Sequence, residues 1–117
     1  MSDSVLRDKA KQFAKEIVYL CRALKRNGAE NALLNQLLRS GTSVGANIHE
    51  AQYAQGTKDF ISKLEIALKE CNESEYWLEL LYETNSLSED DFKPFKGMCI
   101  EIRRMLVSSV STLKSKL

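Results

Sequence analysis

The sequence predicts an all-α protein: a single antiparallel up-down-up-down four-helix bundle domain over residues 1–117. Four segments carry apolar residues three or four positions apart, which is the spacing of one helix face. The connections between them are short, near 27–30, 55–57 and 85–88. Hydrophobic residues make up 44% and charged residues 28%, with one proline. This composition is typical of a folded helical domain rather than a disordered chain.

The first segment spans about residues 3–26. Its apolar positions, all on one side of a helix, are Leu6, Ala10, Phe13, Ile17, Cys21 and Leu24. Asn27 and Gly28 follow, and both residues tolerate the left-handed conformation that ends many helices.

The second segment contains "RSGTSVGANIHEAQYAQ", residues 39–55, which could be a glycine-rich phosphate loop, a linker or part of a helix. Apolar residues keep helical spacing from Leu33 to Ala51 straight through the glycines, so we predict one helix. A phosphate loop would need a preceding strand and a lysine, and the stretch has neither. Gly41 and Gly45 then share a face, where a second helix can approach closely.

The third segment spans about residues 57–84, with Thr57 as its expected N-terminal cap. Its apolar positions are Phe60, Leu64, Ala67, Leu68, Cys71, Leu78 and Leu81. Tyr76, Trp77 and Tyr82 widen the apolar surface beyond one stripe. Such a surplus favours self-association into a homo-oligomer.

The fourth segment repeats the pattern as Phe92, Phe95, Cys99, Ile102, Leu106 and Leu113. Ser88 and the acidic residues after it predict a helix start, through a hydroxyl cap and carboxylates at the positive end of the helix dipole. Pro94 lies too deep for the first turn. It predicts either a bend or a later helix start.

A hairpin of the second and third helices that turns near Gly56 brings together residues whose numbers sum to about 112. This register predicts that Arg39 lies level with Glu73 in a partly buried, charge-assisted pair. Its expected role is to fix the register of the two helices.

No apolar run reaches the roughly 20 residues that span a bilayer, and the first residues lack the apolar core of a signal peptide. We therefore expect a cytoplasmic protein without membrane contact. Cys21, Cys71 and Cys99 lie far apart at helical core positions, which favours buried reduced thiols over disulfides or a metal site.

Catalysis needs a nucleophile with a base, paired carboxylates or a ligand cluster. His49 is the only histidine, and Glu50 beside it points elsewhere on a helix. We therefore expect no enzyme, no catalytic residue, no metal and no cofactor.

The net charge of +1 is unevenly distributed: residues 1–28 carry +4 and residues 57–85 carry −4. Five basic residues of the first helix fall within an arc of roughly 100°, away from the apolar stripe. We call them the basic strip: Arg7, Lys11, Lys15, Arg22 and Arg26. Phosphate contacts from this strip would bind RNA or DNA with little sequence preference. The alternative is an assembly scaffold that recruits a protein partner.

Two motifs, "LLRSGTSVGANIHEA" and "KDFISKLEIALKECNESEYWLELL", resemble the bacterial four-helix bundle proteins encoded by intervening sequences of 23S ribosomal RNA genes. The resemblance covers nearly all of the chain. The matching structural positions are Arg39, Ser43, Gly45, Asn47, Glu50, Glu73 and Trp77. The related accessory variability determinant of diversity-generating retroelements implies, by analogy, a pentamer with nucleic-acid affinity.

Overall fold

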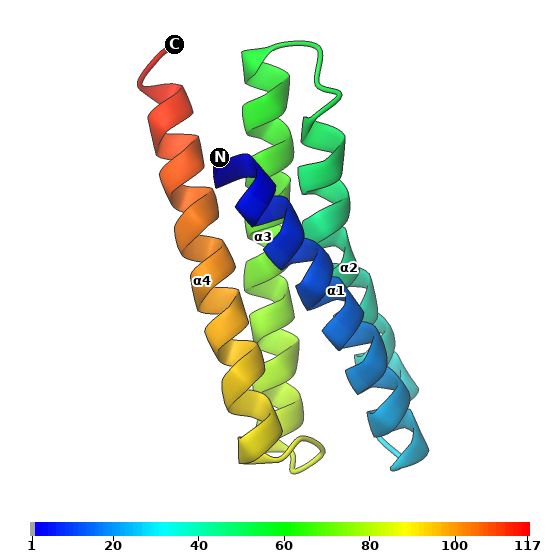
Figure 1. The fold of residues 1–117 in the computed structure, drawn as a ribbon. Coiled ribbons are helices and arrows are strands. Elements are labelled where there is room, and N and C mark those ends of the chain that lie inside the picture. The colour runs from blue at the N-terminus through cyan, green and yellow to red at the C-terminus, as the bar shows by residue number, and fades with distance from the viewer. Residues whose placement is uncertain (1) are drawn as a thin grey trace.

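Four antiparallel helices run up and down in chain order, as the sequence predicts (Figure 1). The computed structural model describes residues 2–117, with side chains from residue 4 onward. The helices are α1 (Ser2–Arg26), α2 (Asn31–Ala51), α3 (Thr57–Glu83) and α4 (Glu89–Lys114). Each helix packs on its neighbours in sequence, and α1 also meets α4.

The apolar stripes meet in one core. Its largest fully buried side chains include Phe13 and Ile17 of α1, Leu37 of α2, Leu78 of α3 and Leu106 of α4. Cys21, Cys71 and Cys99 are buried free thiols, as expected. Burial raises the pKa of Cys21 to about 11, which keeps this thiol protonated and unreactive at neutral pH.

The connections follow from local chemistry. Gly28 has φ +88° and Asn85 has φ +67°, the left-handed conformation that lets the chain leave a helix sharply. The connection between α2 and α3 begins at Gln52, one turn earlier than the sequence suggests, because the backbone after Ala51 closes into turns.

The first turns of α3 and α4 test the two capping predictions. Thr57 is not the cap of α3: it is the first helical residue, and Gly56 holds the capping position without a side chain. The Asp59 carboxylate instead accepts a hydrogen bond from the backbone N–H of Gln55 at 3.2 Å. For α4 the prediction is confirmed, since the Ser88 hydroxyl accepts from the Asp91 N–H at 3.2 Å. Pro94 lies inside α4, which begins before it.

Gly41 and Gly45 are helical, so the stretch of residues 39–55 is neither a phosphate loop nor a linker. A Cβ placed on Gly41 would lie 2.9 Å from side-chain carbons of Ile17, and one on Gly45 would lie 3.4 Å from the carbonyl oxygen of Ala10. The glycines therefore let α1 approach α2 closely, as predicted. This contact sets how the basic strip of α1 sits beside α2.

Candidate nucleic-acid interface

Part of the basic strip lies on the shoulder of α1 beside α2. Its residues are exposed except Arg7, which is half-buried. Arg7 and Lys11 line one groove between α1 and α2, and Arg22 lines a second groove between the same helices. Arg7, Lys11 and Arg22 therefore lie along the junction of two helices, where a ligand can contact both, whereas Lys15 and Arg26 line neither groove.

The carboxylates of α3 are largely neutralised within the bundle. Lys96 Nζ lies 3.0 Å from Glu75 and 2.6 Å from Glu79, and Arg103 lies 2.6 Å from Glu75. Lys114 pairs with Glu65 at 2.8 Å. Carboxylates of this region, whose net charge is −4, thus form ion pairs with basic residues of α4 and with Arg39 of α2.

The part of the chain that the structure describes gives the basic strip no such partners. Among the described residues, no carboxylate lies within ion-pair distance of any of its five cations. Lys9 of α1, which lies outside the strip, forms an ion pair with Glu101 of α4 at 3.1 Å. Arg22 instead lies over the ring of Tyr19, 5.9 Å from its centroid. The positive field of α1 is therefore open to an external anion.

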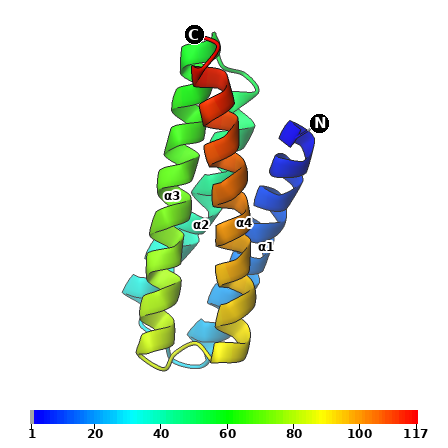
Figure 2. The same cartoon turned by 90° about the vertical axis from the view of Figure 1, so that its left-hand side faces the viewer.

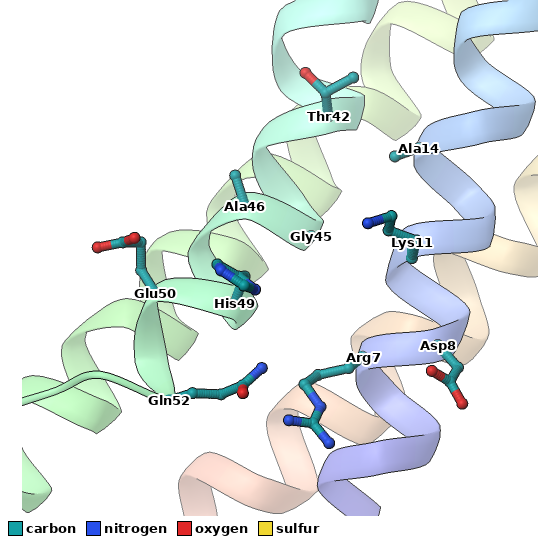
Figure 3. Close-up of a pocket in the computed structure, with 10 residues that line it drawn as sticks. All are labelled: Arg7, Asp8, Lys11, Ala14, Thr42, Gly45, Ala46, His49, Glu50 and Gln52. Carbon is teal, nitrogen blue, oxygen red and sulfur yellow. The ribbon is translucent and has the colours of Figure 1, made fainter.

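We call the first depression the Lys11 groove. Its volume is about 560 Å³, and its lining comes from Arg7, Asp8, Lys11 and Ala14 of α1 and from Thr42, Gly45, Ala46, His49, Glu50 and Gln52 of α2. Figure 3 shows Lys11 and Gln52 pointing into the gap between the helices, with His49 on the α2 side of it, whereas Glu50 points away. Small residues form its floor, so polar and cationic groups surround open space.

The second depression, the Arg22 groove, has a volume of about 450 Å³. Its lining comes from Val18, Cys21, Arg22 and Lys25 of α1 and from Asn31, Leu34, Asn35 and Leu38 of α2. Two cations and two amides thus accompany apolar walls, a combination that suits phosphate and base contacts together. Both grooves lie between the same pair of helices, so one extended ligand can occupy both.

Arg39 and Glu73 form the predicted ion pair, and Glu70 joins it at 3.2 Å from the guanidinium. The Trp77 indole N–H also donates to Glu73 at 3.0 Å. This hydrogen bond, with the Arg39 pair, lowers the pKa of Glu73 despite the opposing effect of burial. The Arg39 side chain is 47% exposed and that of Glu73 29% exposed, so the pair is partly buried on the carboxylate side.

The remaining motif positions of α2 are structural or solvent-facing. Ser43 donates to the Arg39 carbonyl at 2.7 Å, and Asn47 donates to the Ser43 carbonyl at 2.8 Å. Both side chains therefore bond within α2 instead of facing a ligand. Glu50 is exposed. Beneath them, the buried Ser40 and Ser74 hydroxyls share a 2.9 Å hydrogen bond between α2 and α3.

His49 lies on the exposed side of α2, with its ring centroid 5.5 Å from that of Tyr53. It therefore stands on the wall of the Lys11 groove rather than in a catalytic cluster. Across the part of the chain that the structure describes, no group of three ligating side chains could hold a metal ion. In the same part, no helix is long and apolar enough to cross a bilayer.

Sequence reasoning missed Lys25, Glu70 and Ser74, and it assigned no role to Gln52. Lys25 was detectable, because at 100° per residue it falls within the arc of the basic strip. Glu70 lies one turn from Glu73 on α3, and a rule that pairs single facing residues overlooks such a second carboxylate. Gln52 enters the Lys11 groove only because α2 ends there.

A family model described as "23S rRNA-intervening sequence protein" matches residues 2–108 of the chain. The chain is also similar to a crystal structure of a protein with unknown function from the S23 ribosomal protein family of Bacteroides thetaiotaomicron VPI-5482. The identity is 46%, the match covers 95% of this chain and 99% of that one, and the TM-score is 0.92. No curated protein matches the chain. Neither description names an enzymatic activity.

Proposed function

The chain belongs to the 23S rRNA-intervening sequence protein family, and from this premise we propose that it is a non-enzymatic, oligomeric protein that binds single-stranded RNA or DNA weakly along the junction of α1 and α2. The observation that carries the proposal is the distribution of ion pairs. The acidic residues of α3 bind cations of α2 and α4, whereas the cations of the basic strip have no carboxylate partner among the described residues.

The contacts available on this surface define the expected mode of binding. Lysine and arginine side chains along the junction of α1 and α2 contact phosphates and do not read base edges, so sequence preference should be small and affinity should fall with salt. Five cations in one subunit give only modest affinity. Repeated around an oligomer, they give an avid surface if one strand reaches several copies.

The test is a salt-series titration with a labelled single strand, comparing the wild type with a variant in which Lys11, Lys15 and Arg22 become glutamate. All three side chains are exposed, so the bundle should survive. We expect the variant to lose binding. In the wild type, the logarithm of affinity should fall by about 0.7 per phosphate contact for each tenfold rise in salt.

The matched control replaces Lys58, Arg104 and Lys116 with glutamate. These residues are also exposed and form no ion pair in the described structure, so the net charge changes equally at another place. We expect the control to retain most of its affinity. Equal affinities of the wild type and the strip variant, or affinity independent of salt, would remove the strip from the mechanism and favour a protein-recruiting scaffold instead.

A further inference from the structure

The Lys11 groove differs from the rest of the basic strip because its donors converge from two helices. Arg7 and Lys11 come from α1, and His49 and Gln52 come from α2. Figure 3 places the Lys11 ammonium and the His49 and Gln52 side chains around the same gap, with Arg7 below it. Exposed cations along a helix contact a passing chain of phosphates, whereas converging donors can surround one group.

The size of the groove suits a small ligand. Its volume of about 560 Å³ lies within the range of roughly 300–1,000 Å³ that is common for small-molecule sites. Ala14, Gly45 and Ala46 keep the space between the donors free of side chains. One nucleotide fits such a space, and a folded nucleic-acid duplex does not.

The charges favour an anion with more than one negative charge. The groups that face the space are two permanent cations, an imidazole and an amide, while the Glu50 carboxylate points away and Asp8 remains at the rim. A phosphate monoester presents three terminal oxygens and up to two charges, whereas an internal phosphodiester has one charge. Among nucleic-acid phosphates, a terminal one therefore matches this donor set best.

An aromatic surface for the base adjoins these donors. His49 lines the groove, and the ring of Tyr53, a residue that is 70% exposed, lies beside the His49 ring at a 56° angle. Bases stack on such rings with little sequence preference. The groove thus offers a cationic end for phosphate and an aromatic end for a base.

We propose that the Lys11 groove is a mononucleotide site that captures a terminal phosphate monoester, with Arg7 and Lys11 on the phosphate and His49 against the base. The inference rests on the proposed function insofar as the nucleotide is the end of a bound strand. A free nucleoside monophosphate has the same chemistry and would occupy the same groove.

The test compares one single-stranded oligonucleotide in three forms, with a 5′-phosphate, with a 3′-phosphate and with hydroxyls at both ends, together with a nucleoside monophosphate. We expect the wild type to bind one of the phosphorylated forms about tenfold tighter than the hydroxyl form, as one charge-assisted contact provides. The monophosphate should compete for the site. If the phosphorylated strand end binds tighter than the monophosphate, the strand is the source of the bound nucleotide. If the two bind with equal affinity, the source is the free nucleotide.

Three variants separate the groove from the strip. Ala46→Leu fills the exposed floor without changing charge, and Arg7→Gln with Lys11→Gln removes the phosphate donors. Both should abolish the preference for a terminal phosphate, so that each variant binds the phosphorylated and hydroxyl strands with equal affinity. The control, Lys15→Gln with Arg26→Gln, removes the same charge from outside the groove and should keep the preference.

Equal affinity of the wild type for all three strand forms, without competition by the monophosphate, would overturn the mononucleotide site. A different set of results separates the two proposals: the monophosphate binds, Ala46→Leu abolishes that binding, and the hydroxyl strand does not bind at all. In that case the mononucleotide site is supported and the proposed strand-binding function fails. The two proposals therefore fail on different measurements.

Discussion

At the scale of single residues, Gly41 and Gly45 have different steric requirements although they occupy the same helix face. A methyl group on Gly41 would meet Ile17 at its branched, fully buried β-carbon region, whereas one on Gly45 would make near-ordinary contact with Ala10. We expect Gly41→Ala to lower the free energy of unfolding by about 1–3 kcal/mol.

Gly45→Ala is the matched comparison. Alanine favours a helix over glycine by up to about 1 kcal/mol, which offsets the mild crowding, so stability should stay nearly unchanged. Urea unfolding followed by circular dichroism measures both. Equal losses for the two variants would contradict the close contact of Gly41 with Ile17.

The pKa of Glu75 predicts how the stability of the bundle changes at acidic pH. Burial by itself raises the pKa of this carboxyl, but the hydrogen bonds from Arg103 and Lys96 outweigh it and hold the pKa below its ordinary value of 4.5. A carboxyl with a depressed folded-state pKa stabilises the protein above its unfolded-state pKa, and this contribution is lost as the pH falls through the folded value. The free energy of unfolding should therefore decline below about pH 5.

Glu75→Gln should make that decline shallower, because glutamine does not titrate. Glu83→Gln is the control, since Glu83 is exposed and forms no ion pair in the described structure. Unfolding measured from pH 7 to pH 3 decides the matter. A slope that Glu75→Gln leaves unchanged would remove this network from the acid response.

At the scale of a helix, Pro94 is the residue that fits its surroundings least well. It is the sixth residue of α4, so its missing N–H leaves the Asp90 carbonyl without its helical donor, and it is solvent-exposed. We expect Pro94→Ala to stabilise the protein by about 1 kcal/mol or more. Thermal melting measures this. A loss of stability for Pro94→Ala would contradict this expectation.

Ser88→Ala should lower the free energy of unfolding by about 1 kcal/mol, because it removes the side-chain cap of α4.

The four helices and the register of α2 with α3 were predictable, because apolar spacing determines the buried face of each helix. The pair of Arg39 with Glu73 followed from that register and is confirmed. The start of α4 also followed from Ser88. The prediction that Thr57 caps α3 was wrong, because a hydroxyl can cap only if the chain enters the helix at a suitable angle. The turn at Gly56 decides that angle.

The grooves could not be predicted. They depend on how closely α1 approaches α2, which is determined by the contact of Gly41 with Ile17, and periodicity alone does not give that distance. The aromatic surplus of α3 was overestimated for a similar reason. Trp77 packs against the core and bonds to Glu73, and Tyr82 stacks on Phe92 at 4.5 Å, so only Tyr76 remains exposed.

At the scale of the whole molecule, a homo-oligomer remains a prediction, with five subunits suggested by the resemblance. Exposed apolar side chains on the outer side of the bundle supply the physical motive: Ile66 and Tyr76 on α3, and Ile100 and Val107 on α4. Light scattering at micromolar concentration measures the mass. A monomer would refute self-association, and a dimer or tetramer would reject only the subunit number.

The position of α1 has a consequence for how the bundle opens. This helix packs chiefly on α2, and its N-terminal end stands away from α4 (Figure 2). Terminal elements with one main neighbour detach at lower free energy than the rest, so amide protons of α1 should exchange with deuterium faster than those of α3. A nucleotide held between α1 and α2 joins the detachable helix to the body. Adding it should slow exchange selectively in α1, and Ala46→Leu should eliminate that protection.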